Sequence, residues 1–257
     1  MSEVIVERLR EACEAPVRVV PVQGTCQAVR EGSEPALAPR WHTALLVGLL
    51  LSVAVCGSFL QHDAALRGAP AAPRKGAVFG QYLPLLTVSW GLLLYTCRLF
   101  RTGNALPALL GTRWQTLWRA CIDLLLALLT AALIQLLALA AHRFGVGRNA
   151  AVSGLLPRTG AERLVWVLVA TSVGFCEEVV YRGYLQTQLA AFTRSLRWGV
   201  FLQAVLFGIA HAEQGLGSAL CIAGYGLILG TVAQLRRSLL PGIASHVIID
   251  LAAGFWR

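Results

Sequence analysis

Four stretches of the chain contain no acidic residue, Lys or Arg and are rich in Leu, Ala and Val. They are residues 41–62, 76–97, 124–142 and 214–235. Each approaches the roughly 20 residues that an α-helix needs to cross a bilayer. We therefore expect four transmembrane helices at these positions.

Three further segments are apolar but interrupted by charged or polar residues. They are residues 162–192, 197–212 and 239–256. An ionisable group at membrane depth costs about 3 kcal/mol on insertion scales, so a chain that carries several of them usually has a use for them. We interpret these segments as helices with functional polar residues. The predicted fold is an all-α, polytopic transmembrane bundle of about seven spans over residues 41–257, preceded by a polar N-terminal tail at residues 1–40.

Composition supports a membrane protein. Hydrophobic residues make up 56% of the 257 residues, 14% are charged, and the mean hydropathy is +0.64. Ordinary globular proteins carry roughly 25% charged residues. The seven cysteines form no CxxC pair and no Cys/His cluster, so neither a disulfide framework nor a thiolate zinc site is expected.

The formal net charge of +9 does not indicate a nucleic-acid partner. The basic residues stand singly or in pairs between apolar runs, as the flanks of membrane helices do. The chain contains one Lys beside its many Arg, and it is rich in Ala and Gly. This composition suggests a bacterial source, and we expect a multi-pass protein of the bacterial cell (inner) membrane.

The first motif that suggests chemistry combines two acids and one base. Glu178 and Arg182 are four residues apart, so on a helix they share a face and pair. Glu177 is turned by about 100° from Glu178 and escapes this pairing. The motif therefore predicts a structural ion pair, Glu178–Arg182, beside an unpaired carboxylate suited to act as a general base. A polar helix end with a surface ion pair is the alternative.

Two further motifs place histidines near apolar helix faces. Phe207 and His211 share a face at a spacing of four, so the Phe ring can line one side of the imidazole. His246 and Asp250 have the same spacing. Considered alone, His211 is an interfacial residue and the second pair is a polar contact between helices.

The depths of these residues suggest convergence. If residues 194–196 turn the chain, Glu177 and His211 both lie roughly 24 Å from the turn. His246 and Asp250 lie about 10 and 16 Å deep when counted from the same side, and helix tilt can reduce the difference. A base, two histidines and a second acid are thus expected to meet within the membrane.

The three motifs together resemble the CAAX prenyl endopeptidase family, whose bacterial members are called CPBP or Abi proteins. The family pattern is EExxxR, then FxxxH, then HxxxN or HxxxD, on successive membrane helices. The resemblance covers about residues 160–257, which form the expected catalytic core. It implies a glutamic-type intramembrane endopeptidase, without a cofactor, that cuts a membrane-associated protein or peptide.

The resemblance also implies roles for the motif residues. Glu177 would be the base that activates a water molecule, and His211 would position Glu177 or the water. His246 and Asp250 would stabilise the oxyanion. Because an ionised Asp accepts hydrogen bonds and cannot donate them, Asp250 must either be protonated or serve to orient His246. We favour orientation.

Other functions remain as alternatives. A zinc-dependent membrane protease would use His211, His246 and a carboxylate as ligands, although no HExxH motif is present. A proton-coupled transporter would use the same acids, with Asp123, as a relay, although a structural role suits Asp123 better. A non-catalytic membrane protein is the third alternative. The GxxxG of Gly226 and Gly230 predicts close helix packing, within this chain rather than in a dimer.

The resemblance leaves several substrate classes open. They are prenylated C-terminal tails, small peptides and C-terminal sorting segments. The motifs identify no substrate-binding residue.

Overall fold

The computed structural model describes residues 36–66, 78–98, 105–111, 114, 116–146 and 150–255. Within these ranges the chain is helical apart from turns and caps and contains no β-strand, so the predicted all-α fold is confirmed. Most of the predicted tail lies outside the described residues, and the first described helix begins at Arg40. The division into tail and membrane domain stays a prediction.

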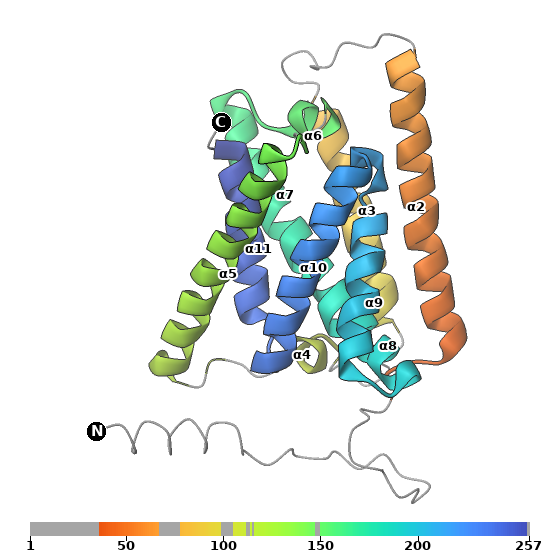
Figure 1. Ribbon diagram of the computed structural model, residues 1–257, viewed down its shortest axis with the longest axis vertical. Coiled ribbons are helices and arrows are strands. Elements are labelled where there is room, and N and C mark those ends of the chain that lie inside the picture. The colour runs from red at the N-terminus through yellow and green to blue at the C-terminus, as the bar shows by residue number, and fades with distance from the viewer. Residues whose placement is uncertain are drawn as a thin grey trace, which may run out of the picture. The chain divides into compact units, whose positions relative to one another are not determined.

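Helices form at each of the seven predicted positions (Figure 1). They are α2 (Arg40–Leu66), α3 (Val78–Cys97), α5 (Leu117–Arg143), the segment α7 (Gly160–Glu177) with its continuation, α9 (Leu196–Ile209), α10 (Leu216–Arg236) and α11 (Leu240–Phe255). Short elements join them: α4 (Ala105–Leu110), α6 (Ala150–Leu155) and the 3-10 turn η2 (Ala212–Gln214).

Four helical segments of the described chain are long and apolar enough to cross a membrane. They are Arg40–Leu60, Leu117–Arg143, Gly160–Thr193 and Leu216–Arg236. Helices α9 and α11 are apolar but shorter, with 14 and 16 residues. The chain is therefore a polytopic membrane protein by its helices, and the predicted number of about seven spans is not confirmed.

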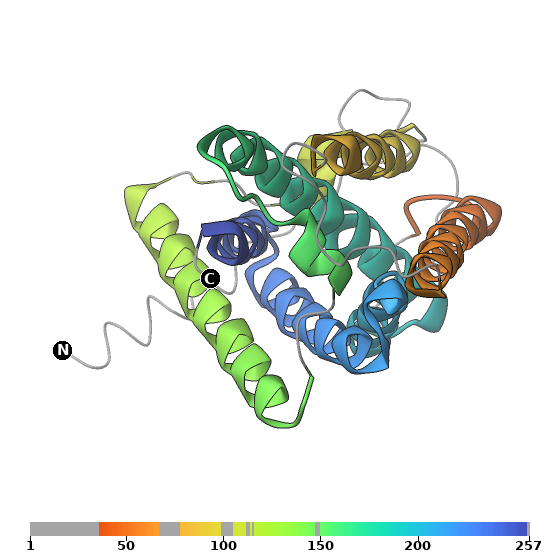
Figure 2. The ribbon, with the colours of Figure 1, turned by 90° about the horizontal axis from the view of Figure 1, so that it is seen from above.

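The segment Gly160–Thr193 is the most deeply packed of the four. About 56% of its most apolar window is buried, against 22 to 28% for the other three. Helices α2 and α5 stand at opposite edges of the bundle (Figures 1 and 2). The central segment changes from α7 to a π-helical stretch, η1 (Glu178–Leu185), and then to α8 (Gln186–Thr193). All eight residues of η1 are buried, and π-helical turns are frequent at functional sites.

Local signals fix both ends of this segment. Thr159 and Glu162 form a capping box that begins α7. At the other end Arg194 adopts a left-handed conformation with φ 54°, and Ser195 then caps α9 by accepting a hydrogen bond from the Trp198 backbone N–H. The predicted turn at residues 194–196 is therefore confirmed.

The GxxxG of α10 packs within the chain, as predicted. A Cβ at Gly226 would lie 2.9 Å from the Ala204 Cα, so only glycine permits this approach of α9 to α10. Gln203 of α9 donates a hydrogen bond to the Gly226 carbonyl, at 2.9 Å, and Gln186 of α8 donates one to the Gly230 carbonyl, at 3.1 Å. Small residues and side-chain amides thus join three helices.

Asp123 has structural partners. Its carboxylate accepts hydrogen bonds from the Arg236 guanidinium, at 2.6 and 2.9 Å, and from the Trp114 indole N–H, at 2.9 Å. The pair connects α5 to the end of α10. Asp123 is not among the described residues that line the cavity of the candidate site.

A buried polar cluster joins the start of α2 to η1 and α8. The His42 Nδ1 lies 2.6 Å from the Tyr184 hydroxyl, and its Nε2 lies 3.3 Å from the Tyr95 carbonyl oxygen. The His42 ring stacks on Tyr95, and Gln188 donates a hydrogen bond to Thr43. No motif in the sequence predicted this cluster.

Candidate active site

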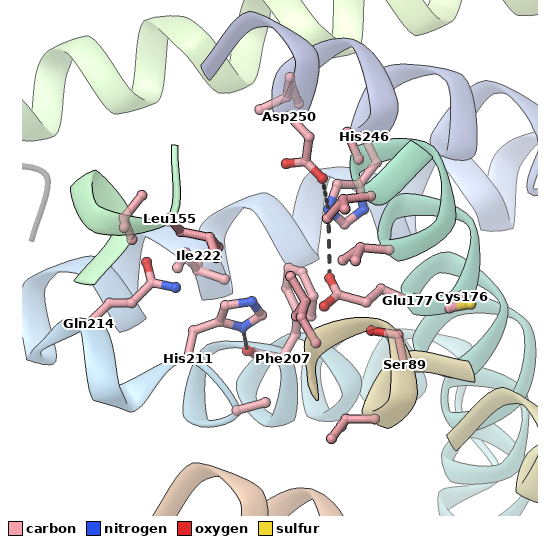
Figure 3. A pocket seen from close by; sticks show the side chains of 18 of the residues that line it. Ser89, Leu155, Cys176, Glu177, Phe207, His211, Gln214, Ile222, His246 and Asp250 are labelled. Carbon is pink, nitrogen blue, oxygen red and sulfur yellow. Dashed lines mark hydrogen bonds and ion pairs between the residues drawn. The ribbon is translucent and has the colours of Figure 1, made fainter. Parts of the chain in front are cut away.

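One cavity of about 630 Å³ contains the predicted functional residues. Glu177, His211, His246 and Asp250 all line it, although they come from three separate parts of the chain (Figure 3). Side chains of α2, α3, α5, α6, α7 and α10 complete its wall, and most of them are apolar. The expected convergence of a base, two histidines and a second acid is therefore present.

Three carboxylates surround the imidazole of His246. Its Nδ1 lies 3.0 Å from Glu178 Oε1, and its Nε2 lies 3.6 Å from Glu177 Oε2 and 3.9 Å from Asp250 Oδ2. Because a carboxylate accepts, the Nδ1–H donates to Glu178. Nε2 then faces the cavity between Glu177 and Asp250.

This geometry corrects the expected role of Asp250. Its carboxylate is 3.9 Å from the imidazole, which is too long for a hydrogen bond. Glu178 makes the hydrogen bond that orients His246 instead. A spacing of four within one helix placed Asp250 near the ring, but a residue of a neighbouring helix lies closer to it.

Glu178 and Arg182 form the predicted ion pair. The Arg182 Nη1 lies 3.0 Å from Glu178 Oε1, and both side chains are fully buried. The guanidinium also lies over the Phe207 ring, 4.2 Å from its centroid, which is a cation–π contact. No guanidinium nitrogen of Arg182 makes a well-aligned hydrogen bond to a described residue, and charge attraction and the ring contact stabilise its position.

His211 lies just beyond the end of α9. Its Nδ1 is 2.8 Å from the Phe207 carbonyl oxygen, so the Nδ1–H donates there and Nε2 is the nitrogen that can accept in the neutral tautomer. The Phe207 and His211 rings meet edge to face at 4.8 Å, as the spacing predicted. Figure 3 shows His211 across the cavity from Glu177 and His246.

Comparison with known proteins agrees with the motif pattern. Residues 159–252 match the model of the family described as Type II CAAX prenyl endopeptidase Rce1-like. The chain carries an Rce1-like domain. Comparisons with the curated proteins and with the solved structures give no match.

The Rce1-like domain begins at the capping residue of α7 and ends within α11. The resemblance predicted from the motifs is thus confirmed. The family, together with the apolar helices, indicates an integral membrane protease of the hydrolase class, with a membrane-associated protein as its substrate.

Glycine lets α11 approach α7 and η1 within the Rce1-like domain. A Cβ at Gly242 of α11 would lie 2.9 Å from Glu178 Oε2, and one at Gly174 of α7 would lie 3.1 Å from the Val247 side chain. The Trp166 indole N–H also donates to the Asp250 carbonyl, at 3.0 Å. Together these contacts hold His246 against Glu178. The sequence shows that small residues stand near the motifs, but it does not show which side chains pack against them.

Helices outside the Rce1-like domain contribute cavity residues that no motif marked. Ser89 and Gln81 come from α3, and Leu50 comes from α2. Within the domain, Gln214 of η2 also lines the cavity. A single polar residue in an apolar helix carries no spacing signal, which is why the sequence did not reveal Ser89 or Gln81.

No group of three or more His, Cys, Asp or Glu side chains within the described residues has a geometry that could hold a metal ion. His211, His246 and a carboxylate are therefore not arranged as a zinc site in this part of the chain.

Proposed function

We propose that this protein is an intramembrane endopeptidase that hydrolyses a peptide bond with a water molecule activated by Glu177. The observation that carries the proposal is the position of the Glu177 carboxylate. It lines the cavity and is 3.6 Å from His246 Nε2, while the adjacent Glu178 takes the ion pair with Arg182. Glu177 thus remains available for proton transfer.

The reaction needs few groups. Glu177 takes a proton from water as the water oxygen attacks the carbonyl carbon of the peptide bond. The carbonyl oxygen becomes an oxyanion, and the C–N bond then breaks as the proton passes from Glu177 to the leaving amine. His211, with its unprotonated Nε2, accepts a hydrogen bond that positions the water.

His246 stabilises the oxyanion as an imidazolium. Its Nδ1–H is committed to Glu178, so Nε2 donates a hydrogen bond only when it also carries a proton. The carboxylates of Glu177, Glu178 and Asp250 favour this positive charge. In this proposal Asp250 stays ionised and balances the imidazolium.

The test is cleavage of a quenched membrane-peptide library by the purified full chain in lipid nanodiscs. Glu177→Gln is expected to lower the rate by about 10²- to 10⁴-fold. Asp123→Asn makes the same carboxyl-to-amide change away from the cavity and is the control for folding and handling. Full activity of Glu177→Gln would overturn the proposal.

A strong chelator in the same assay separates the glutamic from the metal-dependent mechanism. Activity of the wild-type chain that survives chelation supports the glutamate mechanism. Activity that is lost to the chelator and restored by zinc would establish a zinc-dependent protease.

The bacterial cell (inner) membrane is part of the proposal, because it rests on composition. Fractionation of expressing bacterial cells tests it: the chain is expected with the inner membrane. Recovery in the outer-membrane fraction would contradict this location.

A further inference from the structure

Two candidate membrane spans have one end each at the same place in the structure. The span Arg40–Leu60 begins there with α2, and the span Gly160–Thr193 ends there with α8. Figure 1 shows the start of α2 beside the turn between α8 and α9, at the lower end of the bundle. The ends of membrane spans lie at the level of the lipid headgroups. This joint of α2, α8 and α9 is therefore placed where a headgroup can reach it.

Hydrogen bonds hold the start of α2 against α8. The Gln188 Oε1 accepts from the backbone N–H groups of Leu37, at 2.6 Å, and Ala38, at 3.2 Å. The Gln188 Nε2 donates to the Ala38 carbonyl, at 2.9 Å. The Arg40 guanidinium lies over the Phe192 ring of α8, with Cζ 5.8 Å from the ring centroid. The first basic residue of α2 is thus fixed beside the end of α8.

Three exposed arginines gather at this joint. Arg40 begins α2, Arg194 forms the turn after α8, and Arg197 lies in the first turn of α9. No ion pair joins any of the three to another residue that the structure describes. The sequence contains no acidic residue at positions 35–62 or 179–212. The arginines therefore give this surface a net positive charge.

Exposed aromatic side chains accompany the arginines. Trp41 directly follows Arg40 and is 62% exposed, and Trp198 directly follows Arg197 and is 54% exposed. Indole rings are enriched at the membrane–water interface, and the guanidinium fork binds a phosphate group through two parallel hydrogen bonds. An apolar surface beside guanidinium groups fits a phospholipid, which has acyl chains, better than it fits a soluble anion.

We infer that this joint binds the headgroup of an anionic phospholipid. Arg40 contacts the headgroup from α2, and Arg194 and Arg197 contact it from the turn between α8 and α9. The lipid then joins α2, which lies outside the matched residues 159–252 and at an edge of the bundle, to the Rce1-like domain (Figure 2). Because Leu50 of α2 lines the cavity, the bound lipid stabilises the position of a helix that forms part of the cavity wall.

Native mass spectrometry of the full chain in a neutral detergent measures the binding. The chain is titrated with dioleoyl phosphatidylglycerol and, separately, with dioleoyl phosphatidylcholine. The two lipids share their acyl chains and a phosphate, but phosphatidylglycerol alone has a net negative charge. A basic side chain near an anionic headgroup contributes about a factor of five in affinity, so three should favour phosphatidylglycerol by about 100-fold.

Variants of the arginines locate the site. Combined replacement by glutamine, Arg40→Gln with Arg194→Gln and Arg197→Gln, is expected to remove the preference for phosphatidylglycerol. The corresponding triple lysine variant retains the charge and should keep most of the preference, although it lacks the guanidinium fork. Arg143→Gln is the control, because Arg143 is exposed beside Phe144 at the other end of the bundle, and this change should leave both affinities unchanged.

Hydrogen exchange tests whether the lipid joins α2 to the domain. Phosphatidylglycerol is expected to slow the exchange of backbone amides in residues 40–50 of the wild-type chain, and not in the triple glutamine variant. Inorganic phosphate at the same concentration should have no such effect, since it lacks the acyl chains.

Equal affinity of the wild-type chain for the two lipids would overturn the inference. A preference that persists in the triple glutamine variant, or that is lost equally in Arg143→Gln, would also overturn it. Slowing of exchange by inorganic phosphate as strong as that by phosphatidylglycerol would exclude the lipid as the specific ligand. Exchange in α2 that phosphatidylglycerol leaves unchanged would contradict the link between α2 and the domain.

Discussion

Two regions of the molecule bury polar side chains at membrane depth, and they do so in different ways. In the packing region of α8, α9 and α10, Gln186 and Gln203 donate hydrogen bonds to backbone carbonyls of α10. At the cavity wall of α7, η1 and α11, the polar groups of Glu177, His246 and Asp250 are ionisable and face open space. In the first region the side-chain amide N–H groups are used to join helices, and in the second the polar groups remain available to a molecule in the cavity.

The comparison extends to two neighbours in sequence. Glu178 is fully buried and contacts both Arg182 and His246, so it belongs to the packing of the site. Glu177 is partly exposed to the cavity, and its polar contact among the described residues is the long one to His246. Two neighbouring Glu residues can therefore have different roles, and what distinguishes them is whether the carboxylate faces the cavity.

Glu178→Gln is expected to have the largest effect on stability. The change leaves Arg182 as an unpaired buried charge, which costs about 3–5 kcal/mol. Thermal unfolding of the purified chain measures it, with Glu177→Gln as the matched control that shifts the free energy of unfolding by less than about 1 kcal/mol. Equal losses in the two variants would remove the distinction between the neighbouring acids.

His246→Gln should impair catalysis more than stability. Loss of one oxyanion donor typically lowers kcat by about 10²- to 10³-fold. His142→Gln, at an exposed position near the end of α5, is the control and should retain wild-type kcat. If His246→Gln keeps a kcat within about threefold of wild type, another group stabilises the oxyanion.

Gly226→Ala and Gly230→Ala test the packing region. Their Cβ atoms would lie 2.9 Å from the Ala204 Cα and 2.5 Å from the Gln203 amide nitrogen. Each is expected to lower the free energy of unfolding by about 1–3 kcal/mol. Gly80→Ala, with no atom within 4 Å, should be neutral or slightly stabilising. A loss that grows on dilution would indicate packing between two chains instead.

Asp123→Asn should have the smallest effect. The pair with Arg236 is partly exposed, and such pairs contribute at most about 1 kcal/mol. The expected result is a small fall in Tm relative to the wild-type chain, with unchanged cleavage. High salt should make this difference in Tm smaller, because it screens the pair. Loss of activity without loss of stability would favour a proton relay through Asp123.

Hydrophobic patterning predicted the helices well because long apolar runs have few other stable forms in a membrane. The starts of α2 and α3 lie within two residues of the predicted positions. The start of α5 was wrong by seven residues, because Arg119 and Asp123 lie inside the helix, where Arg236 pairs with Asp123. Helices α4 and α6 have six residues each and are too short to show a period.

Spacing predicted the members of the candidate site but not all of their contacts. The Glu178–Arg182 pair and the Phe207–His211 contact follow from one helical turn, so the sequence contains them. The bond from His246 to Glu178 joins residues 68 apart and depends on how closely α11 approaches η1. That approach is set by tertiary packing at Gly242, which no local pattern encodes.

The number of residues in the π-helical stretch η1 matters to the orientation of the site, as well as the identity of their side chains. Glu177, just before η1, faces the cavity. Tyr184 and Gln188, at and beyond its other end, bind the start of α2. The wider turns of η1 set the angle between these two groups around the helix axis. Removing one residue between them would rotate one group by roughly 100° relative to the other. Apart from the Glu178–Arg182 pair, natural variation in η1 is therefore expected to exchange one apolar residue for another more readily than it shortens or lengthens the segment.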